Sequence, residues 1–407
     1  MRDNLEIFLH QPAGGTGLAS GTRAGDFVES PFACSANKAY GGNPYYTSRK
    51  IPFQDGKLIQ KRSLSGDLKM RKFLSAVNIL SLLLLVVVPA QAITIDMVTV
   101  GNPGNAPDTV VMNDGTTGYG EVDYTYQIGK FEITAGQYTA FLNAVARTAD
   151  PYSLDSIGMG NTSDAWRGCN IQRSGPQGNY TYSVAADWAN RPVNYVSWGS
   201  AARFCNWLAN GQPNTGVEDN TTTEDGSYYL NGARGDEALM AITRKSTATW
   251  VIPNENEWYK AAYHKNDGVT GNYWLYPTGT NDLPSNILTT PDPGNNANFF
   301  TQNGGLTIGG PYYRTPVGAF VNSESPYGTF DQGGNVWEWN ETSWRGGAFD
   351  SVDVFLAASF RSYPIARGGA GYENGFRVAY VPEPSSMVLL FSAAIIFIVF
   401  RGKYRMK

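Results

Sequence analysis

The chain has 407 residues, of which 42% are hydrophobic and 16% charged, and its formal net charge is −4 at pH 7. That length allows one large domain or two ordinary ones with a proper core. So small a charged fraction, without a basic excess, argues against nucleic acid as a partner. The 24 Tyr, 10 Trp and 46 Gly residues favour a loop-rich α+β domain, whose aromatic residues either fill an irregular core or form glycan- or protein-binding surfaces. Three cysteines, Cys34, Cys169 and Cys205, allow at most one internal disulfide.

Residues 70–92, MRKFLSAVNILSLLLLVVVPAQA, have the order of parts typical of a secretory signal peptide. Arg71 and Lys72 form a basic start, residues 79–88 form an apolar run, and residues 90–92 form a small-residue cleavage site. Because an export signal acts from the N-terminus, we interpret residues 1–69 as a spurious or disordered upstream extension and predict a mature N-terminus near Ile93. The alternative is an internal transmembrane helix, although the apolar run is short for a span of about 20 residues.

The last segment, 381–407, combines a Pro-Glu-Pro motif at 382–384, an apolar stretch at 387–400 and a basic tail at 401–407. This order resembles the PEP-CTERM sorting signal of Gram-negative bacteria. By the positive-inside rule the basic tail stays cytoplasmic while the apolar transmembrane helix halts in the inner membrane, which leaves the motif at the outer face. The resemblance implies cleavage by a membrane protease of the exosortase type and delivery to the cell envelope, outer surface or extracellular matrix. A plain tail anchor is the alternative.

Between these two signals, residues 93–380 are predicted to form the mature domain. Alternating polar and apolar residues predict strands, and polar capping residues ahead of apolar runs predict helices. The expected strands are 94–100 and 126–134, the expected helices are 135–146 with Thr134 as N-cap, 200–210 and 253–264, and the expected loops are 211–227 and 266–310.

Six segments of this domain, in the same order, resemble the formylglycine-generating enzyme (sulfatase-modifying factor) family. They are IGKFEITAGQYTAFLNAV (128–145), RPVNYVSWGSAARFCNWLAN (191–210), WVIPNENEWYKAAYH (250–264), TPVGAFVNSESPYGTFDQGGNVWEWNE (315–341), WRGGAF (344–349) and NGFRVA (374–379). The resemblance implies an α+β, C-type-lectin-like fold that is loop-rich with little regular secondary structure.

Ordinary structural roles account for most of the residues in these segments. Trp337 and Trp339 alternate along a strand and are expected to enter the core. Arg345 and Arg377 are expected to make buried ion pairs or backbone contacts. The Gly346-Gly347 pair is expected where the backbone takes positive φ or packs closely.

The resemblance also implies a calcium site in the loop before the tryptophan pair. The matching positions are Asp331, Gly334, Val336 and Glu338, which would supply two carboxylates and two backbone carbonyls. A set of hard oxygen ligands suits Ca²⁺ rather than Zn²⁺. The alternative is a glycine-rich turn that carries two solvated acids.

The chain departs from the family where the family's oxidase binds copper(I). The resemblance places two thiolates, five residues apart, at positions that here hold Ser351 and Leu356, and neither residue can replace a thiolate on copper(I). Copper is therefore not expected. Cys205 is interpreted as a buried free thiol or as the partner of Cys169.

These observations predict an exported, envelope-sorted protein that acts as a noncatalytic binding or structural module for a glycan or protein ligand. The competing hypothesis is a formylglycine-generating type of oxidoreductase that acts on a protein cysteine with divergent ligands, since a fold does not determine its function. Before processing, the C-terminal helix would hold the protein in the membrane.

Overall fold

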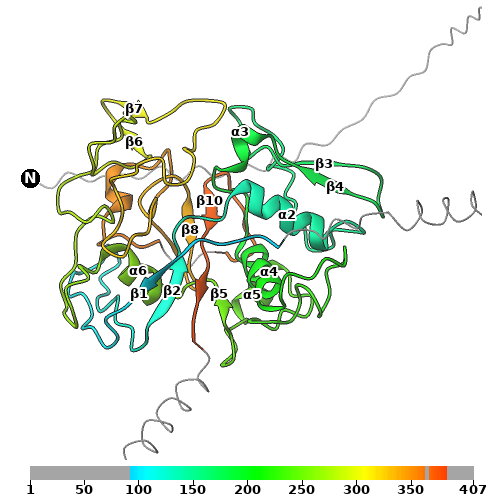
Figure 1. The fold of residues 1–407 in the computed structure, drawn as a ribbon, viewed down its shortest axis with the longest axis horizontal. Helices are drawn as coiled ribbons and strands as arrows, with labels where there is room; N and C mark the ends of the chain where they lie inside the picture. The colour runs from blue at the N-terminus through cyan, green and yellow to red at the C-terminus, as the bar shows by residue number, and fades with distance from the viewer. Residues whose placement is uncertain (1–91, 363–365, 383–407) are drawn as a thin grey trace, which may run out of the picture. The chain divides into compact units, whose positions relative to one another are not determined.

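A computed structural model describes residues 92–362 and 366–382, which all belong to one compact unit. Short strands and helices are connected by long loops (Figure 1). In chain order the elements are β1 (Met97–Val100), β2 (Tyr126–Gly129), α2 (Ala135–Val145), β3 (Gln172–Ser174), β4 (Thr181–Ser183), α3 (Ala186–Ala189), α4 (Trp198–Ala209), α5 (Gly235–Met240), β5 (Trp250–Val251), α6 (Glu255–Tyr263), β6 (Phe300–Thr301), β7 (Gly305–Leu306), β8 (Trp337–Trp339), β9 (Trp344–Arg345), the 3₁₀ helix η1 (Asp353–Leu356), β10 (Asn374–Phe376) and β11 (Ala379–Tyr380). This arrangement confirms the predicted loop-rich α+β fold.

Side-chain caps set the starts of the three main helices. The Thr134 hydroxyl accepts from the Gln137 amide at 3.2 Å while the Gln137 side chain accepts from the Thr134 amide, so α2 begins with the predicted cap. Asn254 and Glu257 form the same reciprocal box at the start of α6. Helix α4 begins at Trp198, two residues before the expected position, because Ser197 is its cap and accepts from the Ser200 amide.

The strands form a four-stranded sheet in the order β1-β2-β11-β5, a three-stranded sheet in the order β10-β8-β9 and two hairpins. Strand β11, at the end of the domain, pairs antiparallel with both β2 and β5, and this joins the two ends of the domain in one sheet. β2 ends at Gly129, before the expected end at residue 134, because the Ile133 amide donates to Phe376 in the other sheet. The hairpin β6-β7 lies within the stretch 266–310, which was expected to be loop.

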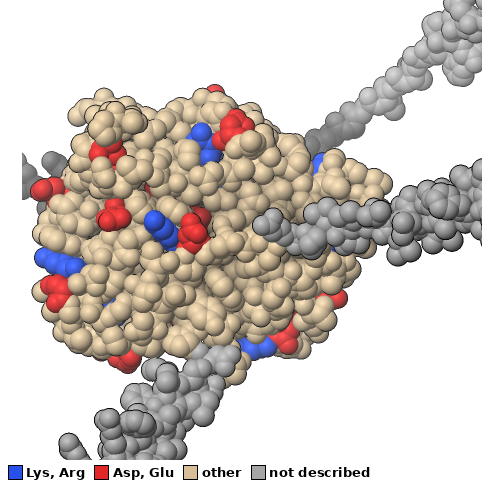
Figure 2. Space-filling model, viewed as in Figure 1, with Lys and Arg blue, Asp and Glu red and all other residues tan. Residues whose placement is uncertain are grey.

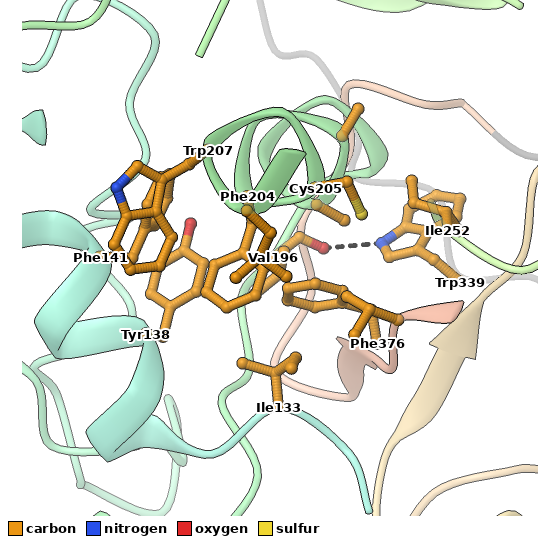
Figure 3. Close-up of a cluster of buried hydrophobic side chains, with 14 of the residues drawn as sticks. Ile133, Tyr138, Phe141, Val196, Phe204, Cys205, Trp207, Ile252, Trp339 and Phe376 are labelled. Carbon is orange, nitrogen blue, oxygen red and sulfur yellow. Dashed lines mark hydrogen bonds between the residues drawn. The ribbon is translucent and has the colours of Figure 1, made fainter. Parts of the chain in front are cut away.

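Aromatic side chains from α2, α4 and β10 meet in the main core (Figure 3). The rings of Tyr138 and Phe204 stack with centroids 6.1 Å apart, and Phe376 packs edge-on against Phe204 at 5.3 Å. Trp339 also enters this core and donates from its indole nitrogen to the Val196 carbonyl at 2.8 Å. Trp337 is buried too, but it packs in a separate cluster with Tyr313 and Phe349, so the two indoles stabilise different parts of the domain.

The predicted ion pairs are present in the interior. Arg345 contacts Glu255 at 2.8 Å, and Arg377 contacts Glu338, with both arginine side chains fully buried. Gly346 and Gly347 have φ of 95° and 75°, conformations that favour glycine, as expected.

The predicted upstream extension, residues 70–91 of the predicted signal peptide and the PEP-CTERM-like segment from residue 383 onward lie outside the described residues. Within residues 92–362 and 366–382, no helix is both long and apolar enough to cross a membrane.

Candidate functional site

Ser351 and Leu356, the two positions that replace the family's copper thiolates, lie side by side next to Gly347. A Cβ atom on Gly347 would stand 3.1 Å from Leu356 Cδ1 and 3.3 Å from Ser351 Cβ. The structure therefore brings together the two positions that the resemblance pairs. It also shows that Gly347 makes room for both of them.

Neither position offers a soft donor for copper(I). The Ser351 hydroxyl accepts from the Ala348 amide at 2.9 Å, and the Ser351 carbonyl accepts from Phe300 at 2.9 Å. Leu356 is fully buried in η1 and packs in an apolar cluster with Tyr276 and Phe299. A hydroxyl that caps a turn and an apolar side chain complete the local fold rather than a copper(I) site.

The cysteines in the described residues do not substitute for this pair. Cys169 and Cys205 are both buried and free, so the bond between them that was left open is not formed. Burial raises the pKa of each thiol, which keeps both thiols protonated at neutral pH. Cys205 lies in α4 against the core (Figure 3).

The four predicted calcium ligands lie in one segment, in which Asp331 is half-buried and the other three are buried, and the Glu338 carboxylate already accepts hydrogen bonds. Its two carboxylate oxygens accept from the Arg377 guanidinium, and one of them also accepts from the Trp258 indole at 2.7 Å. A calcium ion would have to share the Glu338 carboxylate with these two donors. Among the described residues, no group of three or more His, Cys, Asp or Glu side chains is arranged to hold a metal. The calcium site stays a prediction.

The other predicted ligands have local structural roles. Asp331 has φ of 59°, and its carboxylate accepts from the Gly318 amide at 2.6 Å. Burial raises the pKa of Asp331 to about 6, against the lowering effect of Gly318 and Arg377. Gly334 lies so close to Asn298 that a Cβ would stand 2.2 Å from its carbonyl, and Val336 is fully buried.

Glu132 is a buried acid beside this segment that the sequence reasoning missed. Neither carboxylate oxygen has a hydrogen-bond partner among residues 92–362 and 366–382. Burial, and then the nearby Asp331 and Glu338, raise its pKa well above the ordinary value. Its sequence context, a glutamate flanked by Phe131 and Ile133 before a helix, contained no signal for this environment.

A cavity of about 400 Å³ lies next to the Ser351 segment. Phe299 and Phe300 form part of its wall, and the exposed side chains of Gln302, Asn303 and Asp353 add polar groups. An aromatic ring together with amide and carboxylate groups can hold a polar ligand through stacking and hydrogen bonds. The stretch 266–310, which was predicted to be loop, supplies most of this lining.

Charged side chains are sparse on the face shown in Figure 2, where acidic and basic groups lie scattered among uncharged ones. Recognition on this face would therefore depend on hydrogen bonds and apolar contacts rather than on a field of one sign.

The profile of the Sulfatase-modifying factor enzyme 1-like domain matches residues 97–386. The chain belongs to this family. No curated protein has a sequence that matches. The loop-rich architecture, the buried Arg377–Glu338 pair and the adjacent positions 351 and 356 are thus one member's version of the family's domain.

Several solved structures are similar to this chain at low identity. Treponema denticola variable protein 1 has 18% identity and a TM-score of 0.42, with 72% of this chain and 97% of that chain covered. CarF has 18% identity and a TM-score of 0.38, with 71% and 99% covered. PvdO from Pseudomonas aeruginosa has 16% identity and a TM-score of 0.39, with 70% and 94% covered.

Proposed function

We propose that this protein is a noncatalytic binding module that is exported through the inner membrane and sorted to the cell envelope, where it recognises a glycan or a protein. One observation carries the proposal. Ser351 and Leu356 stand together beside Gly347, where the family's oxidase chemistry needs two thiolates, and both side chains serve the local fold.

The cavity of about 400 Å³ beside this segment supports a retained binding role. Its polar groups come from the exposed side chains of Gln302, Asn303 and Asp353, which are free to turn toward a ligand. Phe300 adds an aromatic face of the kind on which sugar rings and peptide side chains pack. We infer that this cavity is the recognition site.

A glycan array, followed by titration of the best ligand, tests the recognition site. We expect Phe300→Ala and Asn303→Ala to weaken binding by about tenfold each, which corresponds to about 1.4 kcal/mol per substitution. Val321→Ala is the matched control, since Val321 is 60% exposed and does not line the cavity. Equal binding by all three variants would place recognition elsewhere.

A sulfatase peptide that contains the target cysteine, incubated in air with copper, tests the noncatalytic assignment. We expect no formylglycine from the wild type, because a protonated hydroxyl and a leucine do not ligate copper(I). The double variant Ser351→Cys with Leu356→Cys should gain copper(I) binding, since the two positions are adjacent. Turnover by the wild type would favour the oxidoreductase hypothesis instead.

Cell fractionation with intact-mass measurement tests export and sorting. We expect the native protein in the envelope fraction, with a mass that shows cleavage near Ile93 and near the Pro-Glu-Pro motif by an exosortase-type protease. Cytoplasmic protein of full length would contradict this part of the proposal.

A further inference from the structure

Residues 92–97 lie along the domain with alternating burial, and the first inward-facing residue is Ile93. Ile93, Ile95 and Met97 are partly buried, whereas Ala92, Thr94 and Asp96 are exposed. Ile93 and Ile95 pack against the main core. The alternation is that of an extended chain laid on a packed surface.

Three successive contacts hold this segment before β1 begins. The Gln137 side chain, from α2, donates to the Thr94 carbonyl at 2.9 Å. The Lys130 amide donates to the Asp96 carbonyl at 2.7 Å, and β1 then pairs with β2. The remaining contact, at Ile93, is made by Gln212, which lies 119 positions further along the chain.

Gln212 forms hydrogen bonds with both backbone groups of Ile93. The Ile93 nitrogen donates to Gln212 Oε1 at 2.7 Å, and Gln212 Nε2 donates to the Ile93 carbonyl at 3.0 Å. Gln212 follows α4 with φ of 59°, an uncommon conformation for a residue other than glycine, and its amide donates to Trp207 at 2.9 Å. The Gln212 backbone therefore adopts an uncommon conformation, in which its side-chain amide contacts Ile93.

We propose that the bond between Ala92 and Ile93 is a processing site and that Gln212 is the receptor for the α-ammonium group that cleavage creates. Water adds at the Ala92 carbonyl and the carbon–nitrogen bond breaks. Ala92 then carries a carboxylate and Ile93 an amine, which takes up a proton at neutral pH. The exposed Ala92 and the partly buried Ile93 place this bond at the boundary of the packed domain.

Cleavage strengthens the contact with Gln212. In the uncut chain the Ile93 nitrogen is a neutral amide with one hydrogen, whereas after the cut it is a charged group with three. A hydrogen bond from a charged donor is stronger than one from a neutral donor. Gln212 therefore distinguishes the mature N-terminus from the precursor. This inference rests on the export part of the proposed function and is independent of the ligand.

The experiment uses the full chain in detergent, with the recognition sequence of a site-specific protease placed directly before Ile93, so that one preparation is melted before and after the cut. The key variant is Gln212→Glu, whose carboxylate faces an amide before the cut and an ammonium after it. We expect the cut to raise the melting temperature of this variant by about 2–4 °C at pH 7.

The pH dependence of this gain in melting temperature shows whether the ammonium charge causes it. The carboxylate raises the pKa of the ammonium above its unfolded value of about 8, so the gain is complete below that pH and is lost as the pH rises through the folded-state value. At pH 10 the cut should therefore give a smaller gain. Gln137→Glu is the matched control, because Gln137 contacts Thr94 and the helix cap rather than Ile93, and its melting temperature should not respond to the cut through charge.

If the cut changes the melting temperatures of Gln212→Glu and Gln137→Glu equally at pH 7 and at pH 10, the proposed role of Gln212 is overturned. N-terminal sequencing of exported protein should return Ile93 first, and a different first residue would overturn the processing site. Absence of any exported protein would contradict the proposed function, while the melting experiment still decides the role of Gln212.

Discussion

Glu338 and Glu132 are two buried glutamates that lie near each other, yet they differ in their hydrogen-bond partners. Glu338 accepts from Arg377 and Trp258, whereas neither oxygen of Glu132 has a partner within the described part of the chain. Two acids that are equally buried can therefore differ in whether hydrogen-bond donors surround them, and a buried acid without donors loses the interactions that would stabilise its charge.

The largest loss of stability is expected when Glu338, the acid that is paired with Arg377, is removed. Glu338→Ala leaves the buried Arg377 guanidinium without its counterion and the Trp258 indole without an acceptor, which should cost about 3–5 kcal/mol of unfolding free energy. Urea denaturation at pH 7 measures this loss. If Glu338→Ala costs no more than Glu132→Gln, the contrast between the two glutamates is false.

The next effect concerns Glu132 and depends on pH. The folded-state pKa of Glu132 lies well above the unfolded value because the site is buried and lies near Asp331 and Glu338. A carboxyl with a raised folded-state pKa makes the protein less stable as pH rises from the unfolded pKa toward the folded one, by up to about 1.4 kcal/mol per pH unit. Glu132→Gln removes this term, so its stability relative to wild type should increase between pH 5 and pH 8. A constant difference across that range would show that Glu132 does not titrate abnormally.

The smallest effect is expected from calcium, because Arg377 already occupies the Glu338 carboxylate. If Ca²⁺ binds through Asp331, a tenfold excess over the dissociation constant stabilises the fold by about 1.4 kcal/mol, and a chelator removes that gain. Asp331→Asn should abolish the response to calcium while it keeps an acceptor for the Gly318 amide. A wild-type melting temperature that is indifferent to chelator rules the site out.

The sequence was sufficient for features that depend on neighbouring residues. Thr134 was recognisable as a helix start because a cap interacts with the next three residues. The ordered family segments predicted the fold, and the identities of Ser351 and Leu356 were enough to question the copper site. The C-terminal and N-terminal signals are equally local, but most of their residues lie outside the described part of the chain, and both signals stay predictions.

Only the tertiary structure decided the contacts that join distant segments. It placed β11 between β2 and β5, paired Glu338 with Arg377, and left Glu132 without a hydrogen-bond partner within residues 92–362 and 366–382. It also set Gln212 against Ile93, across 119 positions. These outcomes depend on which buried donors lie within about 3 Å of which acceptors, and that is determined by packing of the whole domain rather than by local sequence.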